Sequence, residues 1–232
     1  MRVAIAGAGG RMGQALIEAA AADREFEVVV AHDVAGIGKP AGNLKITSEN
    51  KSLSMADVVV DFTQPAGTLE HLKHARAMVI GTTGFSDAQK KSIEEAAKRI
   101  PIVMAANFAV GVNAAYKLAE TAAKILGDAY DVEIVEAHHK NKVDAPSGTA
   151  LKLGEVIGSV RPGKKIAFHS IRAGDIVGEH TVIFAGTGER VEVTVRSQSR
   201  ATYAAGALRA AKWLKGRPAG LYDMADVLGL KQ

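Results

Sequence analysis

The densest group of chemically active side chains in this sequence lies in one polar segment, EAHHKNKVDAPSGTA, at residues 136–150. It holds two of the chain's 7 histidines, His138 and His139, and a lysine, Lys142, follows His138 by four residues. An imidazole with a pKa of about 6.5 suits proton transfer at neutral pH, and an ammonium group can donate a proton. We therefore interpret His138 and Lys142 as candidate proton carriers. The alternative is an ordinary solvated loop.

The end of the same segment offers a place for an anion. Ser147, Gly148 and Thr149 stand at the predicted start of a helix, where hydroxyl groups and unpaired amides can bind a carboxylate. The alternative is a plain helix N-cap. A metal site is not expected, because two adjacent histidines point in different directions and no third ligand follows at helical spacing.

A second chemical motif opens the chain, where GAGGRMG at residues 7–13 follows an apolar run and precedes an alanine-rich one. A glycine-rich turn between a strand and a helix lets a pyrophosphate approach the first amides of the helix. The spacing departs from G-x-G-x-x-G, because Met12 stands where the third glycine belongs and the matching set is Gly7, Gly10 and Gly13. A glycine turn without a ligand is the alternative.

An acidic residue, Asp33, ends the next apolar run, about 20 residues after the loop, where it can accept hydrogen bonds from the adenosine ribose of a dinucleotide. Its charge disfavours a 2′-phosphate, whereas Arg11 in the loop offers that phosphate a cation. The choice between NADH and NADPH is therefore open. Two further turns, Gly81–Gly84 and Ala105–Phe108, also follow apolar runs and are expected at the same edge of a parallel sheet.

The elements that must hold these residues change in kind near residue 107. Short apolar strands alternate with helical stretches in the first half, which indicates βαβ units and a doubly wound parallel sheet. The predicted strands there are 2–6, 27–31, 57–61, 78–80 and 102–105, with helices over 12–22, 68–76 and from the N-cap Ser86.

The second half has strands that no helices separate, which suggests an antiparallel or mixed sheet in a second domain. Its predicted strands are 131–136, 166–171, 180–185 and 191–196, with helices over 112–126, 149–157 and 204–214 and a short segment around 221–228. The fold class is therefore α/β: a Rossmann-like doubly wound parallel sheet domain and an inserted α+β domain with a mixed, largely antiparallel sheet.

Composition sets the broad class. The 232 residues are 47% hydrophobic and 23% charged, with a net charge of +4 and no cysteine. These values exclude a disordered chain, a disulfide framework and a thiolate metal site. The sequence shows neither a basic block for nucleic acid nor an apolar run long enough to span a membrane, and the first residues are too short an apolar run for a secretory signal. We expect a cytoplasmic protein.

Together, these motifs resemble those of dihydrodipicolinate reductase, a family of bacterial lysine and diaminopimelate synthesis. The resemblance rests on the glycine loop, GTTG at 81–84, AANF at 105–108, the segment 136–150 and RAGDIVGEHT at 172–181. It implies a dinucleotide-binding domain formed by residues 1–108 and 201–232. Residues 109–200 would form a substrate-binding domain that also builds a homotetramer.

The resemblance also implies roles for individual residues, with His138 and Lys142 as catalytic. Cofactor contacts fall on Gly7, Ala8, Gly9, Gly10, Arg11, Met12, Asp33, Gly81, Thr82, Thr83, Ala105, Ala106, Asn107 and Phe108. Substrate contacts fall on His139, Lys142, Ser147, Gly148 and Thr149. Family members that bind a 2′-phosphate often carry Arg directly after the acidic residue, where this chain has Val34. We therefore predict that NADH is used at least as well as NADPH.

The expected reaction is reduction of a small cyclic imine dicarboxylate, 4-hydroxy-tetrahydrodipicolinate, by hydride transfer from NADH or NADPH. A reductase of another imine or oxo acid on the same scaffold is the first alternative, because a fold alone does not fix a substrate. A nucleotide-sensing regulatory protein is the second, although it would not need the pair His138 and Lys142.

Overall fold

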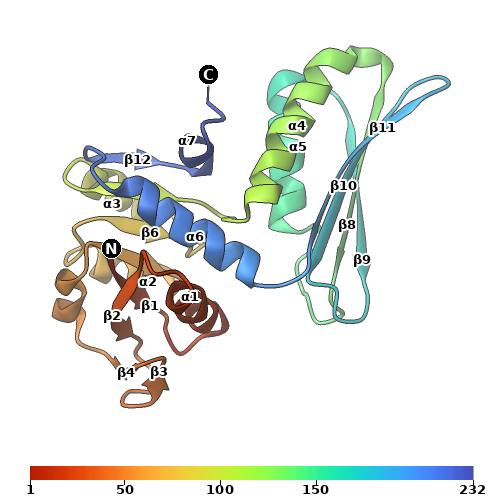
Figure 1. Ribbon diagram of the computed structural model, residues 1–232. Coiled ribbons are helices and arrows are strands. Elements are labelled where there is room, and N and C mark those ends of the chain that lie inside the picture. Colours follow the sequence, from red (N-terminus) through yellow and green to blue (C-terminus); the bar gives the residue numbers. More distant parts are fainter. Residues whose placement is uncertain (232) are drawn as a thin grey trace. The chain divides into compact units, whose positions relative to one another are not determined.

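A computed structural model describes residues 1–231 of the chain. The chain divides into two compact units, which are described separately (Figure 1). Unit 1 is formed by Met1–Ala109 together with the chain from Tyr203 onward, and unit 2 by Val110–Thr202.

Unit 1 is built on a parallel sheet with strand order β12-β7-β6-β5-β1-β2-β4-β3, in which only β3 pairs antiparallel, with β4. The strands are β1 (Arg2–Ala6), β2 (Glu27–His32), β3 (Pro40–Ala41), β4 (Leu44–Thr47), β5 (Val58–Asp61), β6 (Met78–Ile80), β7 (Pro101–Met104) and β12 (Gly220–Tyr222). The central strands β5 and β6 are buried along their whole length, as expected for parallel strands covered on both faces.

Helices cover both faces of this sheet. They are α1 (Arg11–Ala21), η1 (Asn50–Met55), α2 (Pro65–His71), α3 (Asp87–Ala97), α6 (Ala201–Leu214) and α7 (Met224–Leu228). One apolar core includes Leu16 of α1 and Leu214 of α6. A second core, on the other face, includes Leu53 of η1 and Ile93 of α3. The unit is therefore doubly wound, as the alternation of strands and helices predicted.

The strand order reverses around β1. The chain runs from β1 to β2 on one side and then returns to place β5 on the other side of β1, with both pairs parallel. The loops that leave β1 and β5 therefore diverge at the carboxyl edge of the sheet, which is where open α/β sheets bind their ligands.

Unit 2 is a sheet covered by helices on one face. Its strands are β8 (Asp131–His138), β9 (Ile166–Arg172), β10 (Gly178–Ala185) and β11 (Arg190–Ser197), in the order β11-β10-β8-β9. β10 is antiparallel to β8 and β11, whereas β8 and β9 are parallel because α5 (Gly148–Val160) crosses between them.

The core of unit 2 lies between this sheet and α4 (Val110–Leu126) together with α5, which follow the same face of the strands in Figure 1. Ile134, Leu153 and Phe184 are fully buried there. A short helix, η2 (Gly127–Ala129), joins α4 to β8. The mixed, largely antiparallel sheet confirms the predicted fold class.

Some elements differ from the expected ones. The second helix is Pro65–His71 instead of 68–76, since a proline at the first helical position favours a start there. The sequence analysis did not predict β3 and β4, and the segment 221–228 contains both a strand, β12, and a helix, α7. Among the described residues, no helix has the length and apolar character needed to cross a membrane.

Candidate active site

The glycine loop between β1 and α1 is shaped by close backbone approach. Gly7 has φ of +87°, and a Cβ there would lie 2.7 Å from the Phe62 carbonyl oxygen. A Cβ on Gly13 would overlap the carbonyl oxygen of Gly7, so only glycine lets α1 pack this closely on the loop. Gly10 is the N-cap of α1, and within the described chain no side chain caps its first amides. These features suit a pyrophosphate.

Asp33 lies directly against this loop. Its Oδ2 accepts a hydrogen bond from the Gly9 amide at 2.9 Å, and its Oδ1 accepts one from the Ala35 amide at 3.0 Å. The neighbouring Val34 side chain is 81% exposed. The structure thus brings together Asp33 and the glycine loop, two features that the sequence separates by about 20 residues.

The turns after β6 and β7 gather around one aromatic side chain, Phe62, from the loop after β5. A Cβ on Gly81 would overlap the Phe62 ring, and the rings of Phe62 and Phe108 lie 5.8 Å apart in an edge-to-face contact. Thr82 is buried, whereas Thr83 is exposed. The predicted turns 81–84 and 105–108 therefore lie at the same edge as the glycine loop.

In unit 2, His138 ends β8 and belongs to a buried chain of charged groups. Its Nδ1 lies 2.6 Å from Oε2 of Glu136, which is two residues earlier on the same face of the strand. Arg172, at the end of β9, donates to both oxygens of Glu136, at 2.8 and 2.6 Å. Because β8 and β9 are parallel with His138 opposite Arg172, the strand register sets this contact.

In this hydrogen-bonded group, Glu136 is ionised and His138 is neutral. Burial would raise the pKa of Glu136, but hydrogen bonds from Arg172, Ser170 and His138 outweigh it and hold the pKa at about 2. Burial lowers the pKa of His138, and the contact with Glu136 offsets only part of that effect. Because a carboxylate can only accept, Nδ1 of the neutral imidazole carries the proton and Nε2 is left as the basic nitrogen.

A second buried histidine, His180 on β10, packs edge-to-face on His138 with ring centroids 5.1 Å apart. Its Nε2 lies 2.9 Å from Oγ of Ser147. Burial, and then the charge of His138, lower the pKa of His180 to about 4. A neutral His180 pairs with the Ser147 hydroxyl as acceptor or donor according to its tautomer, while the same Oγ accepts from the Ala150 amide at 3.2 Å as the N-cap of α5.

Lys142 lies in the loop that joins β8 to α5, with its Nζ 2.9 Å from Asp144 Oδ1 and its side chain 22% exposed. The hydrogen bond from Lys142 holds the pKa of Asp144 below its usual range. His139 is half-buried directly after the strand. Gly148 is exposed, and a Cβ there would meet nothing within 4 Å.

Glu136, His138 and His180 also place three potential metal-ligand atoms within 4.8 Å of one another. Both carboxylate oxygens of Glu136 already accept from the Arg172 guanidinium, which a cation at that position would displace. The donor set therefore fits a hydrogen-bonded proton system better than a metal centre.

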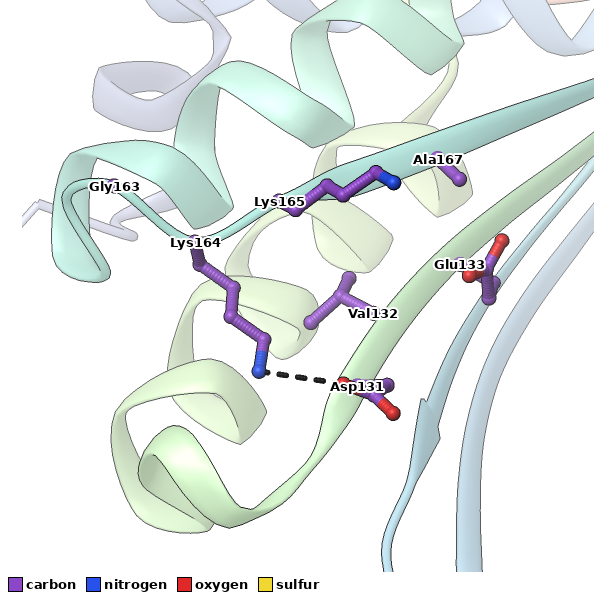
Figure 2. A pocket seen from close by; sticks show the side chains of 7 residues that line it. All are labelled: Asp131, Val132, Glu133, Gly163, Lys164, Lys165 and Ala167. Carbon is purple, nitrogen blue, oxygen red and sulfur yellow. Dashed lines mark hydrogen bonds and ion pairs between the residues drawn. The ribbon is translucent and has the colours of Figure 1, made fainter.

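A separate hollow of about 390 Å³ lies at the other end of β8 (Figure 2). It is lined by Asp131, Val132, Glu133, Gly163, Lys164, Lys165 and Ala167. Figure 2 shows the ion pair of Lys164 with Asp131, at 3.5 Å. Glu133 precedes His138 by five residues, or roughly 17 Å along a strand, so this hollow is not the histidine site.

Sequence reasoning missed four residues of these two sites: Phe62, Glu136, Arg172 and His180. Glu136 had a local signal, because it lies two residues before His138 in a predicted strand and so on the same face. Arg172 and His180 reach the site only through the pairing of β9 and β10 with β8, which no local pattern reveals.

Comparison with known proteins places the whole chain in one group. The family profile described as "Dihydrodipicolinate reductase, N-terminus" matches residues 1–108, and "Dihydrodipicolinate reductase, C-terminus" matches residues 111–228. The 4-hydroxy-tetrahydrodipicolinate reductase of Aromatoleum aromaticum is 52% identical over 265 aligned positions, covering 100% of this chain and 96% of that protein. The reductase of the same name from Cupriavidus metallidurans is 49% identical and covers 100% of both chains.

Solved structures agree. A dipicolinate-bound dihydrodipicolinate reductase from Paenisporosarcina sp. TG-14 superposes with a TM-score of 0.82 at 28% identity, covering 97% of this chain and 98% of that one. The NAD complex of GenD2, from gentamicin A biosynthesis, superposes with a TM-score of 0.62 at 14% identity and shares the fold, covering 99% of this chain and 90% of that one.

The fold and the site thus define an oxidoreductase with a Rossmann-like domain and an inserted mixed-sheet domain. The chain belongs to the dihydrodipicolinate reductase family, the reductases of lysine and diaminopimelate biosynthesis.

Proposed function

We propose that this enzyme reduces 4-hydroxy-tetrahydrodipicolinate, a cyclic dicarboxylate, to tetrahydrodipicolinate: the 4-hydroxyl group leaves as water, and the ring takes up a hydride from NADH or NADPH and a proton. The observation that carries the proposal is the buried chain from Arg172 through Glu136 to His138, at the end of the strand that leads into Lys142 and Ser147. A chain of this kind fixes the tautomer and orientation of a histidine that handles protons.

The residues of unit 1 fit a dinucleotide. Gly7 to Met12 would bind the pyrophosphate and Asp33 the adenosine ribose, and the turns Gly81–Thr83 and Ala105–Phe108 would complete the cofactor site. This proposal is supported by the close packing of the backbone around Gly7 and Gly13, which leaves no room for a Cβ at either position. When bound, the nicotinamide supplies the hydride.

The residues of unit 2 would hold the substrate. Ser147, Gly148 and Thr149 would bind one carboxylate through hydroxyls and amides at the N-terminus of α5, with His139 and Lys142 as further substrate contacts. Fixing the ring in this way raises the rate by orientation.

Lys142 is the better proton donor of the two candidates. His138 is neutral at pH 7, because burial lowers its pKa and its one ring proton faces Glu136, whereas the Lys142 ammonium carries a proton to give. We propose that Lys142 protonates the reduced ring. His138, held by Glu136, would orient the substrate through its basic Nε2, and Lys142 would recover its proton from solvent.

Two variants test these roles. We expect Lys142→Ala and His138→Ala each to lower kcat by on the order of 100-fold or more while near-UV circular dichroism stays that of the wild type. Lys140→Ala is the matched control, because Lys140 is an exposed cation in the same loop and should leave kcat within about twofold. Wild-type kcat in either of the first two variants would refute the role assigned to that residue.

For the cofactor we propose dual use, with NADH accepted at least as well as NADPH. Asp33 keeps an acceptor at the ribose position, and Val34 presents no cation beside it. A kcat/KM for NADPH about a hundredfold above that for NADH would overturn this proposal.

We also propose a homotetramer that unit 2 assembles. One face of its sheet is covered by α4 and α5, whereas His169, Ser170 and Ile171 of β9 are exposed. Light scattering should give the mass of four chains, and a monomer would refute the proposal.

The site belongs to a small-molecule enzyme, and we propose neither nucleic acid nor membrane as a partner. Within this proposal the enzyme works in the cytoplasm.

A further inference from the structure

Unit 1 contains a buried polar cluster that the proposed reaction does not use directly. At its centre is Asp61, the last residue of β5, whose side chain is fully buried. Thr68 and His71 of α2 are buried beside it, as is Thr82 of the turn after β6. Burying a carboxylate costs free energy unless donors surround it, so its presence at the end of an otherwise apolar strand needs a reason.

Donors surround both oxygens of Asp61. Oδ2 lies 2.6 Å from Nδ1 of His71. Oδ1 accepts from the Thr63 amide at 3.0 Å, from the Thr63 hydroxyl at 2.6 Å and from the Thr82 hydroxyl at 3.0 Å.

The Thr68 hydroxyl also lies 3.2 Å from Asp61 Oδ1, so its single proton is shared between Asp61 and Thr82. Because Thr82 gives its proton to Asp61, its Oγ1 acts as an acceptor for its other neighbours. Those are the Thr63 amide at 3.0 Å and the Thr68 hydroxyl at 2.9 Å. Asp61 and Thr82 therefore share the amide of Thr63 between them.

This cluster lies directly below the edge where the cofactor loops meet. The backbone carbonyl of Asp61 accepts from the Gly81 amide at 2.8 Å, so the turn after β6 is tied to Asp61 through both Gly81 and Thr82. The loop after β5 is tied to it through Thr63. Phe62 is the residue between Asp61 and Thr63, so these hydrogen bonds also hold its backbone. Its carbonyl oxygen is the atom that leaves no room for a Cβ on Gly7.

The same cluster reaches the glycine loop by a second route. The ring of His71 packs edge-to-face on the ring of His32, with centroids 4.6 Å apart. The His32 carbonyl accepts from the amides of Gly7 and Ala8 at 2.9 and 3.0 Å. Three loops at the switch point are therefore connected to one buried carboxylate.

We propose that Asp61 is a positioning residue for cofactor binding. Its hydrogen bonds hold the loop after β5 and the turn after β6 against the glycine loop. These loops then have the cofactor-binding conformation before the dinucleotide binds. The inference rests on the proposed function. It goes beyond it in assigning cofactor affinity to a side chain that would not touch the cofactor.

The test compares three variants with the wild type. Asp61→Asn keeps the side-chain size but replaces one acceptor oxygen by a donor. Thr68→Val removes a hydroxyl that lies 2.9 Å from Thr82 Oγ1 and 3.2 Å from Asp61 Oδ1 and leaves the carboxylate in place. Val59→Ala is the matched control, because Val59 is fully buried on the same face of β5, two residues further from the loops. It should lower stability without touching the cluster.

The readouts separate cofactor binding from catalysis. We expect Asp61→Asn to raise the Kd for NADH, measured by fluorescence titration, and the KM for NADH by about tenfold, with kcat within about twofold and the KM for the imine acid unchanged. Thr68→Val should shift the same two constants by a smaller factor. Val59→Ala should leave both at the wild-type value.

A measurement without cofactor gives an independent readout. In hydrogen exchange, the amides of Thr63 and Gly81 should exchange faster in Asp61→Asn than in the wild type, and faster than in Val59→Ala. If Asp61→Asn does not fold, the same comparison is made with Thr68→Val.

Two outcomes would overturn the inference: a Kd for NADH within about twofold of the wild type in the folded Asp61 or Thr68 variant, or an equal increase in Val59→Ala. Failure of the wild-type enzyme to bind NADH or NADPH would instead refute the proposed function, so the two failures are distinguishable.

Discussion

At the scale of residues, the site is defined by the partners of the candidate proton carriers as much as by the carriers themselves. The types and spacing of His138 and Lys142 in a polar segment predict proton transfer, and that role stays a prediction. Glu136 lies two residues before His138 on the same strand face and so had a local signal, whereas Arg172 could not be assigned, because its contact with Glu136 depends on the register between β8 and β9. A pair 36 residues apart leaves no local pattern.

A change at Glu136 tests this dependence. Glu136→Gln keeps the shape of the side chain but removes the charge and the fixed acceptor for Nδ1 of His138. We expect kcat to fall by on the order of tenfold or more. The pKa of His138, followed by NMR, should fall further below its usual value, because Glu136 raises it in the wild type.

The matched control lies on the same strand. Glu133→Gln removes a half-exposed carboxylate whose partner is the exposed His169, at 2.6 Å. It should leave both kcat and the titration of His138 unchanged. If the Glu136 and Glu133 variants behave alike, the proposed role of Glu136 is wrong.

At the scale of elements, long apolar runs and glycine turns were the predictable parts. The strands β1, β5 and β6 and the capping box of α3 at Ser86 follow directly from local pattern. The strands β3 and β12 were missed because neither is an apolar run: β3 is Pro40–Ala41 and β12 is the partly exposed Gly220–Tyr222, whereas the equally short β6 is wholly apolar and buried. Their pairing comes from neighbouring strands.

The contact between α1 and the glycine loop yields a prediction at this scale. Gly13→Ala places a Cβ on the carbonyl oxygen of Gly7 and forces the helix away from the loop. We expect a loss of about 1–3 kcal/mol in the free energy of unfolding, as for other overpacked sites. NADH binding should weaken with it.

Gly158→Ala in α5 is the control, because a Cβ there meets nothing within 4 Å and the position is helical. It should stabilise the protein by up to about 1 kcal/mol. Urea denaturation gives the free energy of unfolding of both variants, and titration gives their affinity for NADH. Unchanged NADH affinity in Gly13→Ala would contradict the assignment of the glycine loop to cofactor binding.

At the scale of the whole molecule, the buried His180 makes the free energy of unfolding depend on pH. The pKa of His180 is about 4 in the folded protein, below the ordinary value of 6.5. An unfolded chain therefore binds a proton at this site between pH 6.5 and 4 while the folded chain does not. Stability is fully present above pH 6.5 and is lost as the pH falls toward 4, by on the order of 3 kcal/mol from this group.

His180→Gln should reduce this loss, measured by urea denaturation at pH 6.5 and 4.5. His169→Gln, at an exposed histidine, should leave the loss as in the wild type. The charged and titratable groups around His180 are His138, Glu136, Lys142 and Arg172, and they stay in place in both variants. An equal loss of stability in wild type and His180→Gln would contradict the assignment.

Steady-state turnover tests most directly which substrate the enzyme reduces. The purified enzyme is assayed with 4-hydroxy-tetrahydrodipicolinate and, in parallel, with simple oxo acids, each with NADH and with NADPH. We predict turnover of the cyclic dicarboxylate with both cofactors and a kcat/KM at least about a hundredfold above that for any simple oxo acid. Equal turnover of the oxo acids, or no reduction of the cyclic dicarboxylate with either cofactor, would contradict it.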